Sequence, residues 1–190
     1  VLKGGNLAVD QEGKEIAKAA RVARIPMLNA YYFFTLYANA EGYQAKEVSG
    51  SSEAIDNYIL SKLKRLSRIV KQGLDTYDVA LSCNEVASFM EILNNWYIRR
   101  TRDRFWSGDQ QAFDVLYTVL VNLSKIMAPL MPFLCEYVYK NLTGGESVHL
   151  ADYPQLENIK LDETLVDEMD FLQDLCSAGK FIREEKNLRN

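Results

Sequence analysis

The chain has 190 residues, of which 48% are hydrophobic and 25% are charged. This length can bury one sizeable core, and the scarcity of Gly and Pro excludes the low-complexity and disordered classes. The formal net charge of −4 argues against a protein that binds nucleic acid over its whole surface, so such binding would have to depend on local basic clusters.

Two short predicted helices occupy the N-terminal part of the chain. The first covers 15–24, and Pro26 should end or kink it. After Pro26, apolar and aromatic residues recur at offsets of three and four as far as Gly42, which should end the second helix. We interpret 1–24 as a lead-in segment and place the start of the main domain at residue 25.

The next predicted helix combines an apolar stripe with a basic cluster. Ser51 and Ser52 can cap it, and its apolar residues recur from Ile55 to Leu74. The opposite half of the helix should then form an exposed ridge. The residues of this basic ridge are Lys64, Arg65, Arg68 and Lys71.

Asp78 can cap a long helix that should break near Ser107 and Gly108. Over 94–106 its sequence interleaves arginines with aromatic rings. The arginines are Arg99, Arg100, Arg102 and Arg104, and the aromatic residues are Trp96, Tyr97, Phe105 and Trp106. Such interleaving suits RNA, because guanidinium groups hold phosphates and flat rings stack on unpaired bases.

A structural interpretation of this segment competes with the RNA interpretation. The rings could belong to the core, while the arginines pair with the acidic stretch near the C-terminus. We favour a core position for Trp96. For the arginines the pattern leaves both interpretations open, because a run of charges is usually a solvated face.

The C-terminal half predicts two further bundle helices and an extension. Helices are expected over 113–127 and 133–142, separated by a proline turn, and Gly144 should close the second. Residues 147–150 have an extended pattern, and 162–179 should form an acidic helix. The chain therefore predicts an all-α antiparallel helix bundle over 25–145, followed by an extension over 146–190.

No phosphate loop, dinucleotide turn, zinc-protease helix or nucleophile elbow occurs in the sequence. His149 is interpreted as structural, not as a general base. Cys83, Cys135 and Cys176 are far apart and lack metal-ligand spacing, so we expect buried, reduced thiols in a cytoplasmic protein. We expect no catalytic residue, no metal, and no membrane segment, because no apolar stretch approaches the roughly 20 residues that span a bilayer.

Several segments resemble the bacterial-type isoleucyl-tRNA synthetase family, in the family's order from end to end of the chain. They cover 26–39, 95–106, 128–133, 146–154 and 183–190. The stretch from Asn95 to Arg100 separates this family from the valyl enzymes, which tend to have an acidic residue in place of Arg99. Leu28 departs from the pattern, since the family has Trp there.

The resemblance implies a class I anticodon-binding domain that positions isoleucine tRNA and does not catalyse. ATP and Mg²⁺ would belong to the parent enzyme, whose catalytic domain would precede Val1, making 1–24 its connection to the bundle. Residues 146–190 would end inside a truncated tRNA-contacting helix. The implied partners are isoleucine tRNA and the missing catalytic and C-terminal domains, in a monomer.

The site prediction joins the resemblance to the residue patterns. The basic ridge or the set from Arg99 to Arg104 would hold phosphates, while Phe105 or Trp106 would stack on a splayed base. Two alternatives stay open. The chain could be the bundle of a valyl enzyme, or an intra-protein scaffold with little RNA contact of its own.

Overall fold

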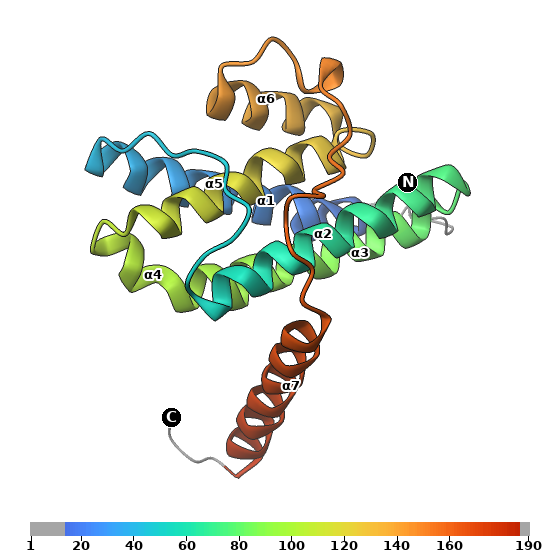
Figure 1. The fold of residues 1–190 in the computed structure, drawn as a ribbon. Coiled ribbons are helices and arrows are strands. Elements are labelled where there is room, and N and C mark those ends of the chain that lie inside the picture. The colour runs from blue at the N-terminus through green and yellow to red at the C-terminus, as the bar shows by residue number, and fades with distance from the viewer. Residues whose placement is uncertain (1–13, 187–190) are drawn as a thin grey trace.

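The computed structural model describes the backbone of residues 14–186 and the side chains of residues 21–186. Within that range it contains helices and no strand, which confirms the predicted all-α bundle (Figure 1). The helices are α1 (Lys14–Glu41), α2 (Ala54–Asp75), α3 (Val79–Glu91), the π-helix η1 (Ile92–Ile98), α4 (Arg99–Trp106), α5 (Gln110–Met127), α6 (Pro132–Thr143), the 3₁₀ turn η2 (Val148–Leu150) and α7 (Glu163–Glu185).

The core is built around α5, which is buried on every side of its axis. Such all-round burial is expected of a central helix. Helices α1, α2, α4 and α6 contact it. The antiparallel pair α2 and α3 approaches so closely at Gly73 that an added Cβ would lie 2.4 Å from Ser82 Oγ, so this position requires glycine.

The helix ends follow the sequence signals in most cases. Asp78 caps α3 by accepting the Leu81 N–H at 2.9 Å, as predicted. Gly42, Gly108 and Gly144 have φ values of +60°, +73° and +68°, which glycine adopts without steric cost. They follow α1, α4 and α6, and confirm the three predicted helix ends.

Two predicted helix boundaries are wrong. Pro26 does not end a helix, because α1 continues through it from Lys14 to Glu41. Its C-terminal half buries an apolar face in the core, which outweighs the one backbone hydrogen bond that proline removes. Ser51 does not cap α2 either, since its hydroxyl bonds the Asp56 carboxylate at 2.6 Å and the Glu53 N–H. The division of the chain at residue 24 stays a prediction.

The segment predicted to be extended around 147–150 is a 3₁₀ turn instead. Glu136 explains the turn, because its carboxylate accepts from the Ser147 hydroxyl and the Val148 N–H. His149 lies exposed on this turn.

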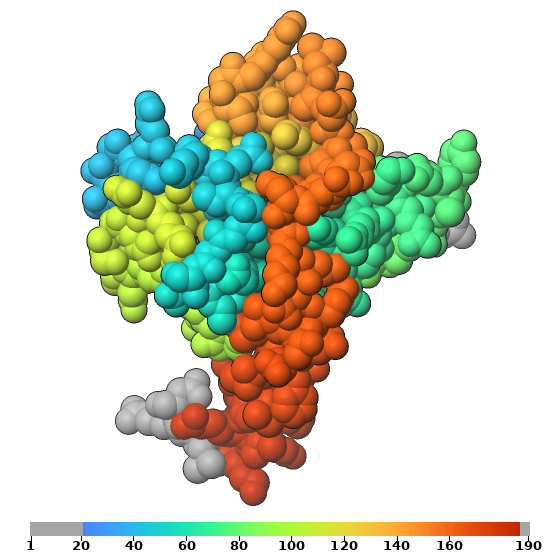
Figure 2. Space-filling view, in the orientation of Figure 1, coloured from blue at the N-terminus to red at the C-terminus, as the bar shows by residue number. Residues whose placement is uncertain are grey.

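Residues 151–162 form an irregular strap that crosses α2 (Figure 2). Lys64 on α2 is buried beneath it and donates to the carbonyls of Glu157 and Ile159 at 3.3 and 2.5 Å. Ser67 donates to the carbonyl of Pro154 at 2.6 Å. The prediction that Lys64 lies on an exposed ridge is therefore wrong, because the strap covers a face of α2 that the apolar periodicity left to solvent.

After the strap, α7 projects away from the bundle (Figure 1). It contacts α2 near its first turns, where Asp170 pairs with Lys62 at 2.9 Å and accepts from the Tyr58 hydroxyl at 2.7 Å. Farther along, Phe171 and Phe181 are exposed. Part of the acidic stretch near the C-terminus is therefore paired with α2, through the ion pair between Asp170 and Lys62.

The cysteines occupy three different environments, and none of the three forms a disulfide. Cys135 is buried, and burial raises the pKa of its thiol to about 12. Cys83 is half-buried and Cys176 is exposed, so the expectation of uniformly buried cysteines is wrong for Cys176. Among residues 14–186, no helix combines the length and apolar character needed to span a membrane.

Replacing Lys64 by Met should lower the free energy of unfolding by about 2 kcal/mol, because two strap carbonyls are deprived of a charged donor. Urea unfolding measures the change. Arg65→Met on the exposed side of the same helix is the matched control and should change stability by less than about 0.5 kcal/mol. Equal effects of the two variants would contradict the buried role of Lys64.

Candidate nucleic-acid interface

The arginines of α4 divide between the interior and the surface. Arg104 points inward, while Arg99, Arg100 and Arg102 are exposed. Thr101 and Phe105 are buried and fix which side of the short helix faces the core.

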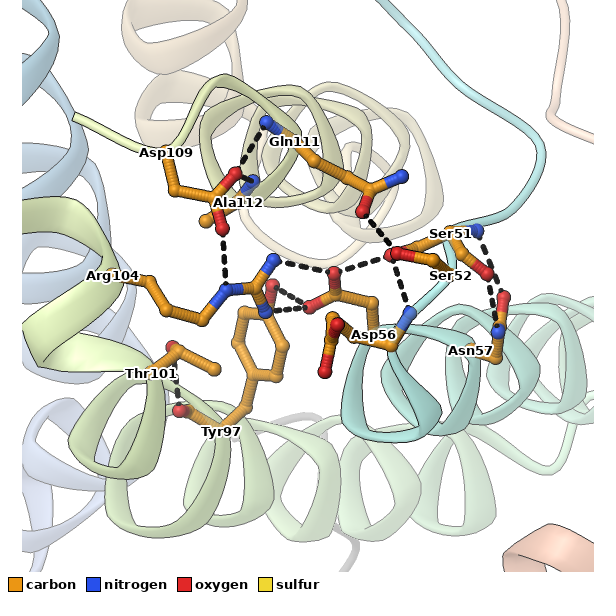
Figure 3. Close-up of polar contacts among 11 residues, drawn as sticks. Ser51, Ser52, Asp56, Asn57, Tyr97, Thr101, Arg104, Asp109, Gln111 and Ala112 are labelled. Atoms are coloured by element: carbon orange, nitrogen blue, oxygen red, sulfur yellow. Dashed lines mark hydrogen bonds and ion pairs between the residues drawn. The ribbon is translucent and has the colours of Figure 1, made fainter. Parts of the chain in front are cut away.

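Arg104 is held by a buried carboxylate (Figure 3). Two of its nitrogens lie 2.9 and 3.0 Å from the two carboxylate oxygens of Asp56, and its Nε lies 2.7 Å from Asp109. Asp56 is fully buried and also accepts from the hydroxyls of Tyr97 at 2.9 Å and Ser51 at 2.6 Å. Arg104 is therefore committed to Asp56 and Asp109 and is not available to a phosphate, contrary to the sequence prediction.

The pKa shifts in this network follow from burial and charge. Burial raises the pKa of Tyr97 well above its usual value, and the neighbouring charge of Asp56 raises it further. Burial alone would lower the pKa of Arg104, but its bonds to Asp56 and Asp109 outweigh burial and raise it. Burial alone would raise the pKa of Asp109, but Arg104 and two backbone N–H groups lower it. All three groups keep their ordinary charge states at neutral pH.

Phe105 belongs to the aromatic core. Its ring lies edge-on to Phe113, with centroids 5.1 Å apart, and to Phe33 at 5.0 Å. It is fully buried. Phe105 therefore cannot stack on a base, and this part of the site prediction is wrong because Phe33 and Phe113 enclose the ring in the core.

Trp106, in contrast, is 56% exposed. Its indole N–H donates to the hydroxyl of Tyr37 on α1, and the guanidinium of Arg102 lies 4.8 Å from its ring centroid. These contacts fix the ring while leaving much of it open to solvent. A flat ring held in this way suits stacking on an unpaired base.

Arg100 lies over Trp96, with its guanidinium 3.6 Å from the ring centroid. Trp96 is half-buried, and its indole N–H is buried without a hydrogen-bond partner among the described residues. The expected core position thus holds for part of this ring.

The exposed arginines of α4 are free of acidic partners. Among the side chains of residues 21–186, Arg99, Arg100 and Arg102 have no partner in an ion pair, so their predicted alternative pairing with the acidic stretch is not observed. Together with Trp106 they form one exposed surface, which we call the α4 face. It combines three arginines that form no ion pair with a partly exposed ring, and the exposed carboxylate of Asp103 lies among them on the same helix.

The basic ridge on α2 is smaller than predicted. Arg65 and Arg68 are exposed, but Lys64 is buried and Lys71 pairs with Asp75 at 2.6 Å. Asp56, where α4 is anchored, lies nine residues before Arg65, or about 14 Å along the helix axis at 1.5 Å per residue. Arg65 and Arg68 thus form a second surface, separate from the α4 face.

Sequence reasoning missed Tyr37 and Asp56. Tyr37 is 69 residues from Trp106, and its sequence context indicates only an aromatic helix face. Asp56 sits at the start of an apolar stripe, and a carboxylate there signals a helix N-terminus equally well. Neither role has a local signal. In the described part of the chain, no cluster of His, Cys, Asp or Glu side chains could hold a metal ion.

Comparisons with known proteins agree with the resemblance seen in the sequence. A family model described as the anticodon-binding domain of tRNA ligase matches residues 56–190. The whole chain aligns with isoleucine-tRNA ligases of Leifsonia xyli subsp. xyli at 42% identity, Corynebacterium efficiens at 43% and Nocardia farcinica at 41%. It spans only 17%, 18% and 18% of the length of these relatives.

Replacing Arg104 by Met should lower the free energy of unfolding by about 3 to 5 kcal/mol, because it leaves Asp56 as a buried carboxylate without its cation. Arg102→Met is the matched control and should change stability by less than about 0.5 kcal/mol. Chemical unfolding of the two variants checks this. A small effect of Arg104→Met would mean that Asp56 is not held as described.

Replacing Asp109 by Asn should cost about 1 kcal/mol at pH 7, because the variant cannot form the ion pair with Arg104. The folded-state pKa of Asp109 lies below its ordinary value of 3.8, so its contribution is fully present above that pH. The contribution disappears as the pH falls through the folded-state pKa. Urea unfolding at each pH from 7 to 3 should therefore show that the difference in free energy of unfolding between wild type and Asp109→Asn narrows only below about pH 4. A difference that stays constant down to pH 3 would contradict the lowered pKa of Asp109.

Proposed function

The chain belongs to the isoleucine-tRNA ligase family, where it matches the anticodon-binding domain, and from this we propose that its α4 face binds the anticodon branch of an isoleucine tRNA. The exposed guanidinium groups of Arg99, Arg100 and Arg102 would hold backbone phosphates. Trp106 would stack on a base splayed out of the anticodon loop.

The observation that supports this role most directly is the contrast between local and overall charge. The chain is acidic as a whole, with a net charge of −4, yet the α4 face presents three arginines without an acidic partner among the described residues. Exposed cations next to a fixed aromatic ring are the two elements that single-stranded RNA binding requires.

The relatives are more than five times longer than the region that aligns with this chain. We assign to the complete protein the joining of isoleucine to its tRNA, with ATP and Mg²⁺ as cofactors of its catalytic domain. This chain would contribute by positioning the tRNA, because a correctly oriented substrate lowers the barrier without a catalytic group on the domain that holds it.

A second candidate function is docking against other domains of the longer protein. The exposed apolar residues of α7 favour it, since Phe171, Leu175 and Phe181 each expose more than half of their surface. Contiguous exposed apolar residues are typical of interaction surfaces. The two functions use different elements, α4 and α7, and can therefore be separated by mutation.

The test is titration of the 190-residue chain with a synthetic anticodon stem-loop of an isoleucine tRNA at several salt concentrations. Reversing the charge of Arg99 and Arg102 to Glu should weaken binding by about 10- to 100-fold at low salt. The slope of log K against log salt should also become shallower, by about 0.7 for each phosphate that the variant no longer neutralises.

Reversal of Lys140 and Lys160 to Glu makes the same change in net charge on exposed residues outside the α4 face. It should weaken binding far less, through long-range attraction alone. If the chain binds no stem-loop, or if both double variants weaken binding equally, the proposed RNA site is wrong and docking becomes the better account.

A further inference from the structure

A groove of about 310 Å³ lies between α1 and the junction of α3 with η1. Its apolar lining comes from Val22 and Pro26 on α1 and from Ala87 and Met90 on the other wall. Its polar lining also comes from both walls. The polar residues are Arg21 and Asn29 on α1, with Glu91, Asn94 and Asn95 on the other wall.

The α1 wall contains an acceptor without its usual donor. Pro26 has no N–H, so the carbonyl of Val22 lacks the hydrogen bond that residue i+4 normally supplies in a helix. Both residues line the groove. One turn farther along, the side chain of Asn29 is exposed and forms no hydrogen bond to any described residue.

The opposite wall includes a π-helix, a rare conformation that occurs frequently at functional sites. Asn94 donates to the carbonyl of Met90 at 2.9 Å, which leaves its side-chain oxygen free to accept. Asn95 is exposed, and its amide bonds no described residue. Arg21 and Glu91 line the same groove but form no ion pair with each other or with any other described residue.

This chemistry matches a nucleobase. A side-chain amide presents one donor pair and one acceptor, the arrangement that pairs with the edge of a base. The apolar lining residues can contact the face of a flat ring, while Arg21 can approach the attached phosphate.

The groove also adjoins the α4 face. Asn95 precedes Arg99 by four residues, so the two side chains lie about one helical turn apart on neighbouring parts of the same surface. RNA held by the α4 face would thus have its next nucleotides within reach of the groove.

We propose that this groove binds one unpaired base of the anticodon loop, with Asn29 and Asn95 reading its edge. The inference rests on the proposed function of the α4 face and adds a specific base-recognition site to it. Asn94 supplies a side-chain acceptor on the wall formed by η1.

The experiment combines protein variants with RNA variants. The 190-residue chain is titrated with the isoleucine anticodon stem-loop and with stem-loops that each lack one base of the loop. Asn95→Ala should weaken binding of the intact stem-loop about tenfold, the effect of removing one amide-base pair. For one loop position, the abasic RNA should bind wild type and Asn95→Ala equally, because the interaction is already absent.

Asn29→Ala should show the same equality at the same loop position. Asn141→Ala is the matched control, since Asn141 is an exposed helical amide on α6 and bonds only a carbonyl in its own helix. It should leave every affinity unchanged. Circular dichroism and urea unfolding of each variant show whether the fold is retained.

The base site would be overturned if Asn95→Ala weakened binding of every abasic stem-loop as much as it weakens binding of the intact one. It would also be overturned if Asn95→Ala left the affinity for the intact stem-loop unchanged. If the Arg99 and Arg102 reversal still weakens binding in that case, the proposed function stands and only the groove assignment fails. If wild type binds no stem-loop at all, both are wrong.

Discussion

The position of α4 depends on the interaction between Asp56 and Arg104. A fully buried carboxylate is unfavourable unless it is paired and hydrogen-bonded, and Asp56 has a forked guanidinium and two hydroxyls around it. The partners come from the segment before α2, from η1 and from α4, and Asp109 extends the network to the start of α5. One side of α4 is thereby fixed to the core, and its remaining arginines and Trp106 are directed outward.

Local signals predicted the helices well. Asp78 as a cap and the glycines at 42, 108 and 144 all have their expected roles, because capping and left-handed backbone conformations depend on a few neighbouring residues. The site was predicted only in part. Arg99, Arg100, Arg102 and Trp106 are exposed as expected, whereas Arg104 is committed to Asp56 and Asp109, and Phe105 to Phe33 and Phe113. A sequence pattern of arginines and aromatic residues does not show which of these side chains are exposed and which are buried, since the partners of Arg104 and Phe105 are fixed by tertiary packing.

Lys64 illustrates the same limit on another surface. Helical periodicity correctly assigns one face of α2 to the core and leaves the rest to solvent, but the strap covers part of that remainder and uses Lys64 as a donor to its carbonyls. An irregular segment has no periodicity, so its sequence does not predict which helix surface it covers. The basic character of α2 is reduced as a result, and the free cations are concentrated on α4.

The π-helix η1 has a further consequence for how this region can vary. A π-turn holds one more residue than the α-helical turn it replaces, so the extra residue within 92–98 is taken up locally between α3 and α4. Removing one residue from this segment would convert the π-turn to an α-turn and leave the flanking helices in nearly the same register. Arg104 would then still face Asp56, whereas a deletion inside α4 before Arg104 would turn it away by about 100°. The segment is therefore the place between α3 and α4 where the loss of one residue disturbs the buried ion pair least.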